Sequence, residues 1–478
     1  MITKHIIPKL FAAWTALCPA VTPLSAATFG NFTYTDDGTS ITITDYPTSA
    51  TGAVVIPATI AGKHVTSIGD SAFSYCSGLT SVTIPSSVKS ISLDAFENCS
   101  GLTSVTIPSS VTSIEVDAFS HCGGLTAISV APTNPNYSSI GGVLFNRART
   151  SLLQYPAGTH GNYNIPSSVT SIEADAFQEC SGLTSVTIPS SVTSIAGGAF
   201  EGCSVLTDIS VAPTNTNYSS IGGVLFNKAR STLLQYPGGI HGNYNIPSSV
   251  TSIGISAFED CSGLTSVTIP SSVTSIEMSA FRYCSGLTSV TIPSSVTRIE
   301  IDAFESCSGL TTAKFSGNAP TMDWGVFDYS APGFKINYIK GKTGFTSPTW
   351  LGYPCVGVAA VPEIDVQQPV GTSLVDGTAK KSFGTVVVGQ SGTAKTFTIK
   401  NAGTGNLSGL AVSKDGANAG NFLITPPAKT TLPPGTSTTF KVTFKPTASG
   451  TRTAAIHINS NDANENPFDI QLTGLGAP

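Results

Sequence analysis

Apolar and polar residues alternate in short blocks that recur along most of the chain. In the block from Leu79 to Cys99, Val82 and Ile84 alternate with polar neighbours, which predicts a short strand with one buried face. Pro85 then turns the chain, a second short extended piece follows, and the segment before the cysteine has the pattern of a short helical turn. The apolar positions of this block are Leu79, Val82, Ile84, Val88, Ile91, Ala95, Phe96 and Cys99.

The block returns with a fixed period, which the cysteines mark. Neighbouring cysteines are 23 residues apart, except across two intervals of 58 residues. Each of these intervals holds one ordinary coil of 23 residues and one long coil of 35 residues, and the long coils span 123–157 and 204–238. A fixed period of about 20–29 residues indicates a solenoid of leucine-rich-repeat type. One such unit buries too few apolar groups to offset the entropy of ordering it, so units must stack. The eight marking cysteines are Cys76, Cys99, Cys122, Cys180, Cys203, Cys261, Cys284 and Cys307.

Each long coil contains an insert with two apolar runs. In the first, Val143–Phe145 and Leu152–Tyr155 flank a polar turn, which predicts a hairpin; the second long coil repeats it. Tyrosines recur in and after the inserts. They are either exposed ligand contacts or part of the packing of the insert. These tyrosines are Tyr137, Tyr163, Tyr218 and Tyr244.

Two features of each coil have a structural interpretation. The residue before each Ala-Phe pair is usually Ser or Asp, which favours helix N-capping over catalysis for Asp94, Asp117, Asp175 and Asp302. Each cysteine follows a phenylalanine by three residues, always at the same apolar phase. We therefore expect a structural ladder of eight buried thiols that act as small hydrophobic side chains, rather than disulfides.

The periodicity fades after Cys307, and the pattern of the chain changes near its end. Residues 28–52 and 308–358 are expected to cap a solenoid that spans 53–307, because a stacked array needs its end faces covered. From residue 363 to 478, pairs such as Phe397/Ile399 and Ile456/Ile458 alternate with polar residues and are separated by turn clusters. This pattern predicts a seven-strand, all-β immunoglobulin-like sandwich.

The first 27 residues have the pattern of a secretory signal peptide. Lys4 and Lys9 precede an apolar run, and small residues at Ser25 and Ala27 suit a cleavage site. No later stretch reaches the roughly 18 apolar residues that span a bilayer, so a secreted or cell-surface location without a membrane span is predicted. The net charge is −5 and charged residues make up 11% of the chain, which argues against a nucleic-acid partner.

Catalytic and metal-binding motifs are missing from the sequence. It contains no HExxH, GxSxG, P-loop or CxxC motif, so we predict a protein that is not an enzyme and uses no cofactor or metal. His160 and His241, equivalent positions of the two long coils, are expected in turns. Three other polar sets were weighed as sites, and ordinary solvation or turn chemistry is favoured for each. These are the glutamates 115, 173, 277 and 300, the loop 461–466, and the Ser/Thr pairs on the outer face of the strands.

The units of the form AFxxCSGLTSVTIPSSVTSI, with GGVLFN and LLQYP in the inserts, resemble the BspA-like leucine-rich repeats (LRR_5 type) of bacterial surface proteins over about residues 50–345. The phrases FGTVVVGQSGTAKTFTIKNAGTGNL and SNDANENPFDIQLTGLG resemble choice-of-anchor D or Hydin-like modules. The resemblance implies adhesion or binding at a cell surface.

Three functions follow from these observations. The leading hypothesis is a secreted or surface-exposed protein that binds an extracellular protein or glycan by multivalent, non-covalent contact through its solenoid. The second is a structural or anchoring protein of the envelope, docked through the immunoglobulin-like module. The third is a carbohydrate-recognition accessory protein that uses the four tyrosines named above.

Overall fold

The computed structural model describes residues 26–478, so most of the predicted signal peptide, including Cys18, lies outside the described residues. Within them the chain is built from short strands, and one 3-10 turn, η1 (Ala419–Asn421), is the one helical element. No helix among these residues is long and apolar enough to span a bilayer. Two compact units are distinguished, one ending at Cys203 and the other beginning at Ser204.

The first unit consists of solenoid coils whose strands form parallel ladders. Coils pair in register at intervals of 23 residues, for example Ser81 with Ser104 and Val82 with Val105. Strand β7 and its equivalents form one ladder, and two-residue strands such as β8 form a second. The strands are β1 (Ala27–Phe29), β2 (Phe32–Asp36), β3 (Ser40–Asp45), β4 (Thr51–Val55), β5 (Thr59–Ile60), β6 (Lys63–Ile68), β7 (Gly78–Thr83), β8 (Ser90–Ile91), β9 (Ser104–Ile107), β10 (Ser113–Ile114), β11 (Ala127–Val130), β12 (Tyr137–Ile140), β13 (Val143–Asn146), β14 (Ser151–Gln154), β15 (Gly161–Asn164), β16 (Ser171–Ile172), β17 (Leu183–Ile188) and β18 (Ser194–Ile195).

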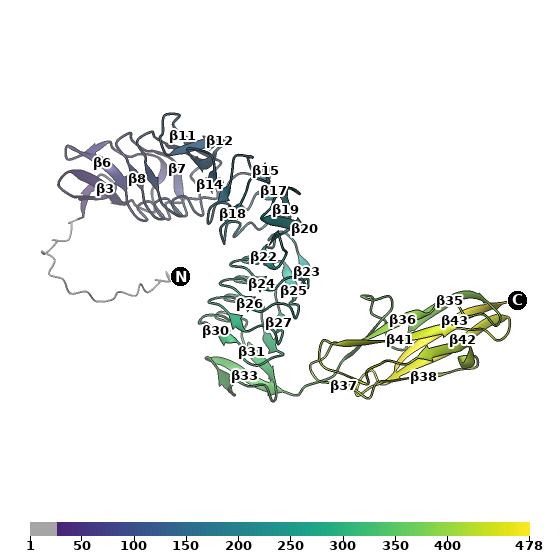
Figure 1. The fold of residues 1–478 in the computed structure, drawn as a ribbon. Helices are drawn as coiled ribbons and strands as arrows, with labels where there is room; N and C mark the ends of the chain where they lie inside the picture. The colour runs from purple at the N-terminus through teal and green to yellow at the C-terminus, as the bar shows by residue number, and fades with distance from the viewer. Residues whose placement is uncertain (1–25) are drawn as a thin grey trace. The chain divides into compact units, whose positions relative to one another are not determined.

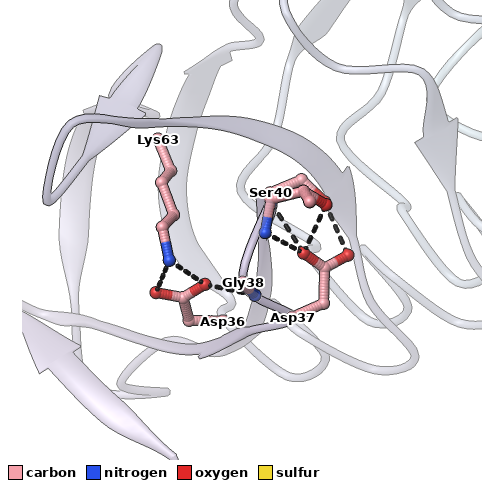
Figure 2. A network of polar contacts seen from close by, with 6 residues as sticks. Asp36, Asp37, Gly38, Ser40 and Lys63 are labelled. Atoms are coloured by element: carbon pink, nitrogen blue, oxygen red, sulfur yellow. Dashed lines mark hydrogen bonds and ion pairs between the residues drawn. The ribbon is translucent and has the colours of Figure 1, made fainter.

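The N-terminal end of the first unit is a small antiparallel meander in which β1, β2 and β3 precede the parallel ladder through β6. A polar network fixes the β2–β3 turn (Figure 2). Lys63 Nζ donates to both carboxylate oxygens of Asp36 at 2.8 Å, and the backbone N–H of Ser40 donates to Asp37 Oδ1 at 2.7 Å. The hydrogen bond from Lys63 lowers the pKa of the Asp36 carboxyl.

The second unit continues with coils of the same type (Figure 1). Strands β22, β24, β26, β28 and β30 form one parallel ladder. The solenoid strands of this unit are β19 (Asp208–Val211), β20 (Tyr218–Ile221), β21 (Val224–Asn227), β22 (Thr232–Gln235), β23 (Gly242–Asn245), β24 (Ser252–Ile253), β25 (Leu264–Thr268), β26 (Ser275–Ile276), β27 (Ser289–Ile292), β28 (Arg298–Ile299), β29 (Thr312–Phe315), β30 (Thr321–Met322), β31 (Lys335–Ile339), β32 (Thr349–Trp350) and β33 (Tyr353–Val358).

The predicted hairpin of each long coil is confirmed, with one strand more than expected. Strand β13 pairs antiparallel with β14, and β12 adds to the other edge of β13. The second long coil repeats this three-stranded arrangement with β20, β21 and β22. Strand β12 has the sequence YSSI, which carries too little alternation to predict a strand.

The C-terminal module (Figure 1) has ten strands, in two four-stranded sheets and the two-stranded sheet β37-β40, where the sequence predicted seven strands. One sheet has the order β34-β36-β41-β39, and the other has the order β35-β43-β42-β38 with β35 parallel to β43. Its core contains Phe397 and Phe440, whose rings stack at 4.9 Å. The strands are β34 (Ile364–Gln367), β35 (Ala379–Val387), β36 (Lys395–Asn401), β37 (Leu407–Ser408), β38 (Ala411–Asp415), β39 (Phe422–Thr425), β40 (Thr431–Leu432), β41 (Ser437–Phe444), β42 (Gly450–Asn459) and β43 (Phe468–Ala477).

Candidate functional site

The cysteines of the repeat lie in the core of the coils. All eight are buried and none forms a disulfide, and the same holds for Cys355. The thiol of Cys284 donates to the backbone carbonyl of Phe258 at 3.0 Å, and that of Cys99 donates to Phe73 at 3.1 Å. Burial raises the pKa of the Cys122 thiol to about 12. A neutral buried thiol is a poor nucleophile and metal ligand, so this ladder has the chemistry of a structural element.

The residue before each Ala-Phe pair does not cap a helix, so that prediction was wrong. Asp94 has a φ of 55° and Asp117 a φ of 59°, in the left-handed region, whereas an N-cap residue is extended. The segment that follows is a tight turn, in which the N–H of Glu97 donates to the carbonyl of Asp94 at 2.9 Å. Asp and Gly tolerate left-handed backbone, and Ser takes the same conformation at Ser71, Ser256 and Ser279.

The four tyrosines that were weighed as ligand contacts are half-buried, Tyr137 and Tyr218 in the inserts and Tyr163 and Tyr244 in the strands that follow them. Tyr163 packs on Tyr155 at a ring distance of 4.8 Å, and Tyr244 packs on Tyr236 at 4.7 Å. Tyr137 accepts a hydrogen bond from the N–H of Ile114 at 2.8 Å. Each of these contacts is one that packing of the insert would make, and contact with a ligand stays a prediction for Tyr137, Tyr163, Tyr218 and Tyr244.

The glutamates of the proposed acidic stripe each accept a local hydrogen bond. Ser252 donates to Glu277 at 2.6 Å, and Arg298 donates to Glu300 at 2.9 Å. Ser171 donates to Glu173 at 2.6 Å. These hydrogen bonds fit a solvated edge on which each glutamate has a polar partner nearby, which is the interpretation that the sequence favoured.

The loop 461–466 gathers oxygen atoms of three acids. Glu363, Asp462 and Glu465 each place a carboxylate oxygen within 4.8 Å of the others. Asp462 is buried, and its two oxygens accept the N–H groups of Ile364 at 2.8 Å and Asn464 at 3.3 Å. Burial, with the negative charge of Glu363 second, raises the pKa of Glu465. The backbone contacts of Asp462 give this cluster a structural role in holding the loop.

An exposed apolar stripe runs along one edge of the solenoid in the second unit. It comprises the exposed residues Ile255, Met278 and Trp324 and the half-buried Ile301, and neighbouring members are 23 residues apart. The exposed fractions are 39% for Ile255, 41% for Met278 and 66% for Trp324. The N–H of Ser256 donates to the carbonyl of Met278 at 3.0 Å, so consecutive members lie on adjacent coils. Four coils about 4.8 Å apart make a stripe roughly 14 Å long.

The stripe ends at a cleft near the last coils. The cleft has a volume of about 510 Å³ and is lined by Trp324, Leu351 and Tyr353, together with the carboxylates of Asp323 and Asp328. Leu351 is also largely exposed, with a φ of 50°. The hydroxyl of Tyr353 donates to Asp328 at 2.8 Å. An apolar ridge that leads into a cleft with a polar rim is a common form of protein-binding surface.

Sequence analysis missed the stripe, although a signal for it was present. The residue two positions before the Ala-Phe pair is exposed in seven of the eight coils and half-buried in the eighth, at Ile301, yet it is a large apolar residue in five coils. A periodic apolar residue on an exposed position is hard to explain by folding, because it gains little from burial. These residues are Leu93, Val116, Ile255, Met278 and Ile301.

Comparison with known proteins places the two parts of the chain in families. Residues 54–345 match the BspA type leucine rich repeat region in three segments, 54–161, 159–242 and 236–345. Residues 378–474 match the HYDIN/CFA65/VesB-like Ig-like domain. No curated protein matches the chain.

Three bacterial proteins are among the solved structures to which the chain is similar. A leucine-rich repeat protein from Eubacterium ventriosum is 24% identical, with a TM-score of 0.42, over 65% of this chain and 77% of that one. A leucine rich cell surface protein from Faecalibacterium prausnitzii is 26% identical, with a TM-score of 0.36, over 62% and 89%. The pneumococcal vaccine antigen PcpA is 19% identical, with a TM-score of 0.36, over 66% and 94%. The family match covers more than half of the chain, which therefore belongs to the BspA-type leucine-rich repeat proteins and carries a HYDIN-like immunoglobulin-like domain after the repeats.

Proposed function

We propose that this protein is exported to the bacterial cell surface, where it binds an extracellular protein partner through the edge of its solenoid. The apolar stripe of Ile255, Met278, Ile301 and Trp324 carries the proposal. Folding does not require large apolar side chains at exposed positions, whereas removing them from water on binding is favourable. The family match and the signal-like N-terminal segment support the location.

The proposed mechanism is non-covalent contact over several coils. Because the coils stack in register, each places its apolar side chain one strand spacing from the next. A partner with an extended apolar edge can therefore contact several coils at once, and the contributions of single residues combine. The low charge of the chain limits long-range attraction, so we expect affinity to come from buried area more than from steering.

An extracellular-protein array and a glycan array, probed with residues 28–478, test this proposal. We expect saturable binding to a protein that is lost in the double variant Met278→Ser/Trp324→Ser. The matched control is Val387→Ser, which removes an exposed apolar residue from the immunoglobulin-like module. Binding only to glycans would contradict the proposal. Protein binding that the double variant retains as fully as the Val387→Ser control would contradict it too.

A deletion of residues 363–478 separates this function from anchoring. If the solenoid is the binding part, the deleted chain keeps its affinity for the partner. If the module alone binds, affinity disappears with the deletion and the solenoid proposal fails.

A further inference from the structure

The negative charge of the chain is concentrated in the coils that carry the apolar stripe. Residues 239–330 contain eight acidic and three basic side chains, a net charge of −5. Because the whole chain also has a net charge of −5, its remaining residues are balanced in charge. The low average charge thus hides a local excess around the stripe. The eight acids are Glu259, Asp260, Glu277, Glu300, Asp302, Glu305, Asp323 and Asp328.

Four of these acids are direct sequence neighbours of stripe residues. One precedes Met278, one lies on each side of Ile301, and one precedes Trp324. All four are half-buried, so part of each side chain is in contact with solvent beside the stripe. The four acids, called the acidic rim below, are Glu277, Glu300, Asp302 and Asp323.

Backbone hydrogen bonds hold the stripe and the acidic rim in register. The N–H of Ser279 donates to the carbonyl of Ile301 at 3.0 Å, and the N–H of Asp302 donates to the carbonyl of Trp324 at 3.4 Å. The N–H of Glu300 donates to a carbonyl of the preceding coil at 2.9 Å. Adjacent coils therefore present apolar residues in one row and acids beside that row.

Two arginines offset only part of the negative charge. Arg298 contacts Glu300 at 2.9 Å and Asp323 at 3.4 Å. Arg282 contacts two buried glutamates at 2.5 and 3.4 Å. Each arginine thus serves two carboxylates, and an excess of negative charge remains. The third basic residue, Lys314, lies in β29 of a different sheet.

This charge decides which partner fits the apolar stripe. A second copy of the chain is a poor partner, because symmetric pairing would bring one acidic rim against the other. Nucleic acids and anionic lipids are repelled for the same reason. The complementary surface has apolar side chains in a row, with lysine or arginine on its flanks.

The spacing of the coils favours a helix as that surface. Neighbouring coils are about 4.8 Å apart, and one turn of an α-helix rises about 5.4 Å. Alternate side chains of an extended strand are about 6.8 Å apart. Over three coil spacings the mismatch reaches about 2 Å for the helix and about 6 Å for the strand. A helix can therefore place one apolar side chain on each of the four coils.

We propose that the apolar stripe and the acidic rim bind a cationic amphipathic helix of the partner protein. The apolar face of the helix covers the stripe, and its flanking lysines or arginines reach the rim while their stems cover apolar surface. Buried area supplies the affinity, and the rim selects the partner by charge. The inference rests on the proposed function, because it names the chemistry of the partner at the same surface.

Synthetic helices test this inference by calorimetry with residues 28–478. The probe is a lysine helix of about 16 residues, roughly 24 Å long, with leucine at every third or fourth position. One control replaces its lysines by glutamates, and a second scrambles the sequence to remove the apolar face. We expect one-to-one binding of the probe, weakened by added salt, and at least tenfold weaker binding of both controls. No saturable binding of the probe, or equal binding of either control, would overturn the inference.

Variants of the chain locate the bound helix. E277Q/D323N removes two charges of the rim with little change in side-chain shape and should weaken binding of the lysine helix at least threefold. The matched control D45N/D70N removes two exposed acids of the first unit and should leave binding unchanged. Circular dichroism checks that each variant is folded. An equal loss in both variants, or full binding by Met278→Ser/Trp324→Ser, would refute binding at the stripe.

Two further measurements separate this inference from its alternatives. Sedimentation of the chain tests for a second copy, and a dimer that Met278→Ser/Trp324→Ser abolishes would replace the helix as occupant. The array partner separates the inference from the proposed function. If its binding needs the stripe but is unchanged in E277Q/D323N, the cationic helix is wrong and the proposed function stands. If no array protein depends on the stripe, the proposed function itself fails.

Discussion

Replacing Phe281 with alanine tests whether the ring column holds the coils together. The Phe281 side chain is fully buried, and its ring stacks on Phe258 at 4.6 Å and on Phe304 at 4.8 Å. A buried Phe→Ala change costs about 3–5 kcal/mol. Both ring neighbours lose a partner, so we expect a value at the upper end of that range.

The loss of stability in Phe281→Ala should be confined to nearby coils, because each coil contacts mainly its neighbours. Hydrogen exchange of the full chain, followed by mass spectrometry, shows which coils lose stability. The N–H of Phe281 donates to Ala303, and the N–H of Phe258 donates to Ala280. A loss of about 4 kcal/mol predicts exchange roughly 10³-fold faster for these amides and little change in the immunoglobulin-like module.

Trp324→Ala is the matched control for this prediction. It removes a larger aromatic side chain that is 66% exposed, so the free energy of unfolding should change by about 0.5 kcal/mol or less. If Phe281→Ala cost less than about 1.5 kcal/mol, or no more than the control, the ring column would not be the source of coil stability.

Three further predictions concern titratable groups and thiols. Because burial, followed by repulsion from Asp175, raises the pKa of Asp117 to about 6 from an unfolded value near 3.8, its ionisation destabilises the fold; the free energy of unfolding should fall as the pH rises from 4 to 7. After a discount for partial exposure, Asp117→Asn should therefore stabilise the protein by about 1–2 kcal/mol at pH 8, measured by urea unfolding. The hydrogen bonds that the His457 ring donates to the carboxylates of Asp469, first, and Asp415 raise the pKa of His457, so its stabilising contribution is full below pH 6.5 and is lost as the pH rises through the folded pKa; thermal unfolding of His457→Gln should show a flatter pH profile, and an unchanged profile would refute this role. Thiol titration of the denatured, unreduced chain should find all nine described cysteines free, and fewer would indicate disulfides.

The solenoid could be predicted from sequence because its signal is repeated. One block is ambiguous, but eight cysteines with a common period fix the coil length and show that Val82 and Val105 occupy equivalent positions. The same repetition located the hairpins of the long coils. It did not reveal β12, because that strand is polar and is held by its pairing with β13.

The turn before each cysteine was misread for a chemical reason. Asp is favoured as an N-cap and is also tolerated in left-handed turns, so Asp94 fits either interpretation. The backbone angles decide between the two, and sequence does not contain them.

The candidate sites depend on relations between coils. Met278 and Trp324 look like ordinary core residues until the register places them on an exposed edge. Asp117 and Asp175 are separated by 58 positions, and they meet because the long coil between them contributes no turn of its own. Such contacts are set by the path of the insert, which the local pattern does not specify.

Oxidative footprinting of the bound protein tests the central claim, that the apolar stripe is the contact surface. Met278 and Trp324 carry readily oxidised side chains, and both are exposed in the free chain. With the array partner bound at saturation, we predict that oxidation of Met278 and Trp324 falls at least fivefold, while the exposed Tyr75 on the first unit reacts as before. Unchanged oxidation of Met278 and Trp324 in the saturated complex would contradict the account.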